Sequence, residues 1–199
     1  MRALQVGLVL SALAGALVSP ASAQALRAAG WAVCGDSVPT PTDESIAQDG
    51  LRSAILSAPV SGSVACFRQG IVATPFRGQT LRLSGWMRGT VDSPVAGLWM
   101  RIEGSDSGWP FDNMEGRPAT SSQEWRQYQI VLRVPTDAEA IFFGAMLQGP
   151  GTVWVDHFSL EIVPPGTRQT GQMLDVDVPS SWSLALAPEN LSFEAIVAP

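Results

Sequence analysis

The middle and second half of the chain alternate between hydrophobic and polar residues with a period of two. This period is typical of β-strands that bury one face and expose the other. In residues 80–88, leucine and methionine occupy one face, while arginine, serine and tryptophan occupy the other. Residues 96–103 repeat the pattern. The hydrophobic positions are Leu81, Leu83 and Met87 in the first segment and Leu98, Met100 and Ile102 in the second.

Further strands follow with similar spacing, and Gly, Pro and Asp separate them. Beyond the first residues, no long segment repeats its hydrophobic residues at the helical period of 3.6. Short strands divided by turn residues predict an all-β fold, an antiparallel β-sandwich. The other expected strands are 51–57, 63–69, 125–134, 140–147 and 152–163, with weaker candidates at 173–178 and 183–186. The prolines in 38–42 argue against a central strand there.

The N-terminus has the features of an export signal. Arg2 precedes an apolar run over 4–18, and Ala21-Ser-Ala23 is a small-residue cleavage site. We therefore predict a signal peptide over 1–23, a single β-sandwich domain over 24–163, and a linker with a C-terminal tail over 164–199. The protein would be exported to the periplasm or the extracellular space, with no membrane span after cleavage. An uncleaved N-terminal anchor is the alternative.

Charge and cysteine content narrow the choice of partners. The formal net charge is −6, and an acidic surface disfavours nucleic acid because phosphate binding needs clustered positive charge. In an exported chain, Cys34 and Cys66 are expected to form a disulfide; two buried thiols are the alternative. With two Cys and one His, a structural zinc site is improbable.

Aromatic and polar residues suggest a ligand-binding surface. Four of them lie on the polar faces of two strands that we expect to be neighbours, and three lie in the connection 104–122. Sugar rings stack on aromatic faces, while Arg and Asn bind hydroxyl groups. The alternative is a second core layer of Trp capped by Arg. The predicted residues are Trp86, Arg88, Trp99 and Arg101 on the strands and Trp109, Phe111 and Asn113 in the connection.

The last strands resemble the galactose-binding-like jelly rolls of secreted carbohydrate-binding modules. Trp125 and Tyr128 match the Trp-x-x-Tyr strand of that superfamily, and Asp156 matches the first Asp of a pair whose second member is His157 here. A closer resemblance, through 81–87, 97–102, 111–114 and 117–118, is to an ancillary sandwich domain of bacterial exported proteins, found beside peptidase domains and in regulators. The resemblance implies a jelly-roll domain and a non-catalytic module, but it implies no ligand, since one fold hosts many functions. We expect the module to bind a carbohydrate or an envelope component; a structural or protein-interaction module is the alternative.

The tail carries a motif that such modules usually have at their start. Asn190-Leu-Ser-Phe-Glu194 resembles the first strand of the family, which normally precedes a Gly-Trp pair, here Gly30-Trp31. We therefore expect residues 190–194 to dock as an edge strand. They would dock on their own sandwich or, by strand exchange, on that of a second copy, which would give a homodimer. In the alternative, the tail is the start of another module and does not dock.

The resemblance also implies a calcium site. Related jelly rolls use the Asp of the last strand and the Glu of the first, which correspond to Asp156 and Glu194. Hard oxygen ligands suit Ca²⁺. In the alternative, Asp156 accepts hydrogen bonds from loop amides at a strand bulge. Apart from this possible structural calcium, we expect no cofactor.

Catalysis is not expected. Gly35-Asp-Ser-Val38 resembles the nucleophile block of GDSL-type esterases, and Asp156-His157 would supply an acid and a base. Adjacent residues of a strand face opposite sides, however, so both cannot serve one nucleophile. Paired carboxylates for glycoside hydrolysis can meet in any fold, but no pair stands out. The loop acids Asp106, Asp112 and Glu115 are expected to be solvated.

Overall fold

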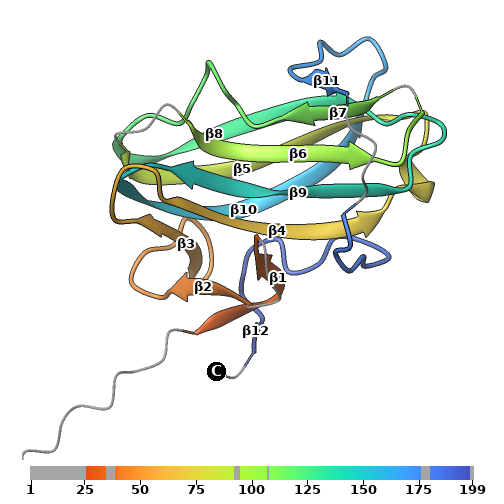
Figure 1. Ribbon diagram of the computed structural model, residues 1–199. Helices are drawn as coiled ribbons and strands as arrows, with labels where there is room; N and C mark the ends of the chain where they lie inside the picture. Colours follow the sequence, from red (N-terminus) through yellow and green to blue (C-terminus); the bar gives the residue numbers. More distant parts are fainter. Residues whose placement is uncertain (1–25, 35–38, 92–94, 107, 176–179, 198–199) are drawn as a thin grey trace, which may run out of the picture.

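The computed structural model describes residues 26–34, 39–91, 95–106, 108–175 and 180–197; the expected signal peptide lies outside them. The described chain forms one continuous antiparallel sheet that folds over into a sandwich (Figure 1). The strands are β1 (Arg27–Val33), β2 (Pro39–Asp43), β3 (Ser53–Ala58), β4 (Val64–Val72), β5 (Thr80–Val91), β6 (Val95–Glu103), β7 (Trp109–Asp112), β8 (Ser122–Arg133), β9 (Ala140–Gln148), β10 (Gly151–Val163), β11 (Gln172–Leu174) and β12 (Ile196–Val197), with one 3-10 turn at Thr74–Phe76.

Two layers make up the sandwich. The first layer has the order β11-β7-β6-β9-β4-β1, and the second has the order β3-β10-β5-β8. Strand β2 lies between β1 and β3 and joins the layers, while β12 pairs with β1. The predicted jelly-roll β-sandwich is therefore confirmed. In the described part of the chain, no helix is long and apolar enough to cross a bilayer.

The core lies between the layers and contains the hydrophobic faces that alternation predicts. All six leucine, isoleucine and methionine side chains assigned to the inner faces of 80–88 and 96–103 are buried. Burying a side chain of this size contributes about 1.5–3 kcal/mol. Aromatic rings fill the end of the core near the tail: Trp31, Phe67, Phe143, Phe158 and Phe193.

The expected neighbouring position of segments 80–88 and 96–103 is wrong. Strand β5 pairs with β10 and β8, whereas β6 pairs with β9 and β7. The two strands belong to opposite layers, so their leucine faces meet in the core and their polar faces point outward on opposite sides. Trp86 and Arg88 therefore lie on a different surface from Trp99 and Arg101.

The proline-rich segment forms a strand after all. Residues 39–43 are β2, although the prolines argued against a central strand there. Proline and threonine alternate, so the missing N–H groups of the prolines fall on one side. Thr42 donates its N–H on the other side to the carbonyl of Leu26, 2.8 Å away. Pairing with β3 is limited to Thr42 and Asp43, so no proline N–H is needed there.

The tail packs on its own sandwich, but residues 190–194 do not form a strand. Asn190 and Phe193 have φ angles of 48° and 61°, so the segment is a turn. The expectation of a strand over 190–194 is therefore wrong; the pairing residues come later, where Ile196 and Val197 lie opposite Ala28 and Arg27. The turn places the fully buried Phe193 against the Trp31 ring, with centroids 5.0 Å apart.

A disulfide joins the end of β1 to β4. Cys34 and Cys66 are bonded, with their Cα atoms 5.2 Å apart and a sequence separation of 32. The N–H of Cys34 also donates to the carbonyl of Cys66. The predicted pairing is confirmed.

Candidate functional site

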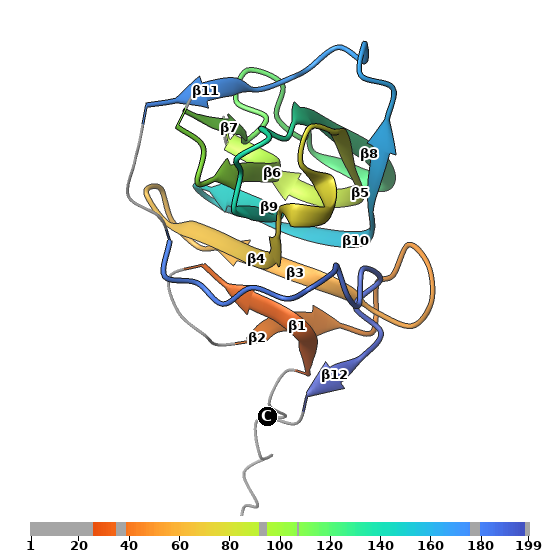
Figure 2. The same ribbon diagram turned by 90° about the vertical axis from the view of Figure 1, so that its right-hand side faces the viewer.

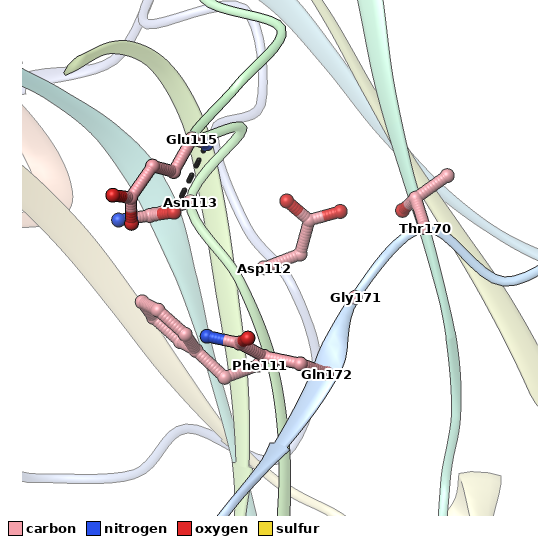
Figure 3. Close-up of a pocket in the computed structure, with 7 residues that line it drawn as sticks. All are labelled: Phe111, Asp112, Asn113, Glu115, Thr170, Gly171 and Gln172. Atoms are coloured by element: carbon pink, nitrogen blue, oxygen red, sulfur yellow. Dashed lines mark hydrogen bonds between the residues drawn. The ribbon is translucent and has the colours of Figure 1, made fainter. Parts of the chain in front are cut away.

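A polar hollow of about 290 Å³ opens at the edge of the first layer, where β7 meets β11. Amide, carboxylate and hydroxyl side chains surround it, together with one aromatic ring (Figure 3). Two of the predicted ligand-binding residues, Phe111 and Asn113, lie here. The lining residues are Phe111, Asp112, Asn113, Glu115, Thr170, Gly171 and Gln172.

Two local hydrogen bonds shape the loop after β7. The N–H of Met114 donates to Oδ1 of Asp112 over 2.7 Å, and the N–H of Glu115 donates to Oδ1 of Asn113 over 3.1 Å. Met114 takes a left-handed conformation with φ 60° and is buried in the core. Because Met114 anchors the loop, the side chains of Asn113 and Glu115 lie together on one side of the hollow (Figure 3).

Asp112 is buried and forms an ion pair with Arg117, so the expectation that this acid is solvated is wrong. Burial of a carboxylate is costly unless it is paired and hydrogen-bonded, and here it is both. Glu115, by contrast, is exposed as expected. The hollow therefore carries one solvent-facing carboxylate beside one whose charge is compensated.

A glycine brings the second wall close. Strand β11 pairs with β7, with Gln172 opposite Phe111. A Cβ atom on Gly171 would collide with the carbonyl oxygen of Phe111, so only glycine permits this approach. Thr170 is fixed to the neighbouring β8, because its N–H donates to the carbonyl of Val131 and its hydroxyl accepts the Val131 N–H. The Gln172 side chain is exposed beside the Phe111 ring (Figure 3).

Phe111 connects the hollow with an aromatic cluster on the outer face of the first layer. Trp99 is only 5% exposed and lies with Phe142 at the centre of this cluster. Trp109 is 3% exposed, and the Arg101 guanidinium lies 6.0 Å from its ring centroid. Trp99 and Trp109 therefore form a second core layer that Arg101 caps, which is the alternative to a ligand-binding surface. The faces of both tryptophan rings are covered in this structure.

The structure brings only part of the predicted site together. Trp99, Arg101, Trp109, Phe111 and Asn113 lie on or beside the first layer's outer face. On the opposite face of the sandwich, the Arg88 guanidinium lies 5.9 Å from the Trp125 ring, and Trp86 lies opposite Asp156 and Gln127. Sequence reasoning treated Glu115 only as a solvated loop acid. It missed Gln172 and Trp182, because they lie far in sequence from the residues that they approach in the fold.

Asp156 anchors a bulge in β10. Its oxygens accept hydrogen bonds from the N–H groups of Gln48, Asp49 and His157, at 2.8, 3.2 and 2.7 Å. Burial raises the pKa of Asp156, although these hydrogen bonds oppose the rise; the nearby Glu194 carboxylate adds to it. Glu194 accepts the Leu51 N–H over 2.8 Å. Asp156 thus accepts hydrogen bonds from loop amides at a strand bulge, as expected in the alternative to a calcium site.

Among the described residues, no group of three or more His, Cys, Asp or Glu side chains could hold a metal ion. His157 has φ 48° and points Nδ1 at Asp49, 3.3 Å away. The esterase-like block at 35–38 lies outside the described residues.

One curated relative shares clear sequence similarity. It is an uncharacterized HTH-type transcriptional regulator, YbfP, from Bacillus subtilis (strain 168), 37% identical over 139 residues. The match covers 67% of this chain but 43% of the regulator, so the chain spans less than half of that relative's length. No protein-family model matches the sequence.

The solved structures define the class of fold. One is the CBM22-1 xylan-binding domain of Paenibacillus barcinonensis Xyn10C, with 15% identity and a TM-score of 0.50 over 67% of this chain and 86% of that domain. Another is the CBM22-1–GH10 portion of Clostridium thermocellum xylanase Xyn10B with xylohexaose. It has 13% identity and a TM-score of 0.51 over 67% of this chain and 26% of that one. The chain has the jelly-roll fold of carbohydrate-binding modules, as its sequence resemblance implied.

Proposed function

We propose that the protein is an exported, non-catalytic module that binds a hydroxyl-rich carbohydrate or envelope glycan in the hollow between β7 and β11. The observation that carries the proposal is the combination of the Phe111 ring with the amides of Asn113 and Gln172 and the carboxylate of Glu115. Amides and carboxylates form paired hydrogen bonds with sugar hydroxyls, and an aromatic edge or face packs against the C–H groups of the ring. The jelly-roll fold and the disulfide expected of exported chains support it.

Variants of the hollow test the proposal. After a glycan array with the mature chain identifies a ligand, Asn113→Asp and Gln172→Ala should each weaken binding about tenfold, because each removes a donor worth about 1.4 kcal/mol. Asn113→Asp keeps the oxygen that accepts the Glu115 N–H, so the loop is preserved. Gln127→Ala, an exposed amide on the opposite face, is the matched control in titration calorimetry. Equal affinities for all three variants would show that the glycan binds elsewhere on the protein.

A protein-interaction module is the second candidate function. The similarity to part of a transcriptional regulator favours it, because a domain that recurs beside a DNA-binding segment can hold subunits together or bind a regulatory ligand. A chain that binds no glycan on the array but forms a stable dimer, for instance by exchange of its tail, would support this candidate over the first.

Calcium at Asp156 and Glu194 is a proposal with a defined donor set. Both carboxylates accept hydrogen bonds from the loop 48–51, and the buried side-chain oxygen Oε1 of Gln48 has no hydrogen-bond partner among the described residues. A hard cation held by these oxygens would take the rest of its six to eight ligands from backbone carbonyls and water, and it would relieve the repulsion between the two carboxylates. The calcium ion would stabilise the fold and would take no part in a reaction.

About 10 mM CaCl₂ should raise the melting temperature above its value in EDTA. A site with Kd on the order of 0.1 mM would stabilise the fold by about 2.7 kcal/mol at that concentration. Asp156→Asn should abolish the shift, and an equal concentration of MgCl₂ is the control for ionic strength. A shift that survives in the Asn variant would contradict the site.

A further inference from the structure

A second cavity, of about 440 Å³, opens where the two layers of the sandwich separate. Strands β1 to β4 surround it, and they lie together in the lower part of Figure 2. In the described chain, β2 pairs with β3 only at Thr42 and Asp43, and β1 pairs with β4 only at Ala32 and Val33. The strand ends beyond these short pairings line the cavity.

The described lining of this cavity is mostly apolar and carries no charge. Leu56 and Phe67 belong to the main core, so the cavity reaches the space between the layers, whereas Val64 is 59% exposed at the surface. The two cysteines of the lining are bonded to each other and do not titrate. A cavity of this size and character is typical of sites for small, mostly apolar molecules. The lining residues are Val33, Cys34, Thr40, Pro41, Ile55, Leu56, Ser57, Val64, Ala65, Cys66 and Phe67.

One polar group of the lining lacks a partner. The Thr40 side chain is 0% exposed, and its hydroxyl oxygen has no hydrogen-bond partner among the described residues. Burying a hydroxyl without a partner costs free energy, which a ligand with a suitable polar group would recover. Two other hydroxyls show the usual arrangement. That of Thr42 donates to the Leu26 carbonyl over 3.0 Å, and that of Ser57 lies 2.8 Å from the Thr152 hydroxyl.

We propose that this cavity binds a small, neutral, mostly apolar molecule with a single uncharged oxygen group, as a medium-chain alcohol has. The carbon chain contacts Leu56 and Phe67, and the oxygen group forms a hydrogen bond with the Thr40 hydroxyl, which can donate or accept. A charged ligand is disfavoured, because the described lining offers no opposite charge to offset its burial. The cavity shares no lining residue with the hollow between β7 and β11, so the inference is independent of the proposed glycan binding.

Titration calorimetry of the full mature chain with 1-octanol is the first experiment. The alcohol should bind saturably at one site. 1-Hexanol should bind about 15-fold more weakly, because each buried methylene contributes about fourfold to the affinity. Octanoate has the same number of carbons but is charged at pH 7, so it should bind more weakly than 1-octanol by about tenfold or more.

Variants of the lining locate the site. Thr40→Val should weaken 1-octanol binding about fivefold, because the hydrogen bond is lost. The same variant should raise the melting temperature of the free protein by about 2–4 °C, because it removes an unpaired buried hydroxyl. Thr42→Val is the matched control: it should leave the affinity unchanged and lower the melting temperature, because it removes the bond to Leu26. Ala65→Leu, which fills part of the cavity, should weaken binding about tenfold.

The proposal is overturned if 1-octanol does not saturate a site, if octanoate binds as tightly, or if Ala65→Leu leaves the affinity unchanged. Equal affinities of Thr40→Val and Thr42→Val would also overturn it. A Thr40→Val variant that melts at a lower temperature or fails to fold, as judged by circular dichroism, would show that the hydroxyl stabilises the free protein. The hydroxyl would then not be available to a ligand, and the proposal would be wrong.

Discussion

Phe193→Ala will lower the free energy of unfolding by about 4 kcal/mol, the usual cost of emptying a fully buried phenylalanine site. Phe193 is 0% exposed and packs against Trp31, Phe67 and Phe158, with ring centroids between 5.0 and 5.8 Å away. Urea denaturation followed by tryptophan fluorescence measures the change. The control is Leu186→Ala in the same tail, because Leu186 is 83% exposed and its truncation should cost less than about 0.5 kcal/mol.

Removing residues 188–199 should cost more than the single substitution. The deletion would also remove the acceptor of the Trp31 indole N–H, which donates to the Asn190 carbonyl over 2.8 Å. It would expose the edge of β1, where Ala29 donates to the Ala195 carbonyl. An unchanged melting temperature in the truncated chain would show that the tail does not stabilise the fold in solution. A dimer of the full chain that becomes monomeric on truncation would instead indicate exchange between copies.

Alternation predicted most of the core because it is a local signal. The faces of β5 and β6 that carry Leu and Met are buried as expected, since each strand presents one face to the partner layer whatever its neighbours are. Neighbour relations depend on how connections cross the sandwich, and alternation contains no information about that. For this reason the expectation that Trp86 and Trp99 share one surface is wrong: they lie on opposite faces of the sandwich.

In the tail, the sequence motif predicted the contacts of the segment but not its backbone conformation. The resemblance of 190–194 to a first strand identified residues that contact the start of the domain, and Asn190 does contact Ala29. The motif could not reveal that Asn190 and Phe193 take left-handed conformations. The Phe193 N–H donates to the Asn190 carbonyl and the Ala195 N–H donates to Asn190 Oδ1, and the resulting turn places the Phe193 ring in the core. Tertiary packing overrides the local preference here.

The sequence predicted the candidate site only where its aromatic and polar residues lie close together along the chain. Phe111 and Asn113 occur together after β7 and could be recognised as a polar and aromatic loop. Gln172 and Trp182 come from distant segments without periodicity, and contacts over such separations depend on the whole fold. The need for glycine at position 171 follows only from the structure, where the backbone at Gly171 approaches the Phe111 carbonyl too closely for a side chain.

Replacing both cysteines by alanine will lower the free energy of unfolding by roughly 3–4 kcal/mol, the loop-entropy value for a bridge across about 30 residues. Cys34 and Cys66 close a loop that contains β2 and β3, the strands that join the two layers. Without the bridge, the unfolded chain gains freedom, while the native state keeps the backbone hydrogen bond between the same residues. Denaturation with and without a reducing agent measures this. The reductant should destabilise the wild type by the same amount and leave the double variant unchanged; a double variant as stable as the oxidised wild type would mean that the sheet alone fixes the junction of the layers.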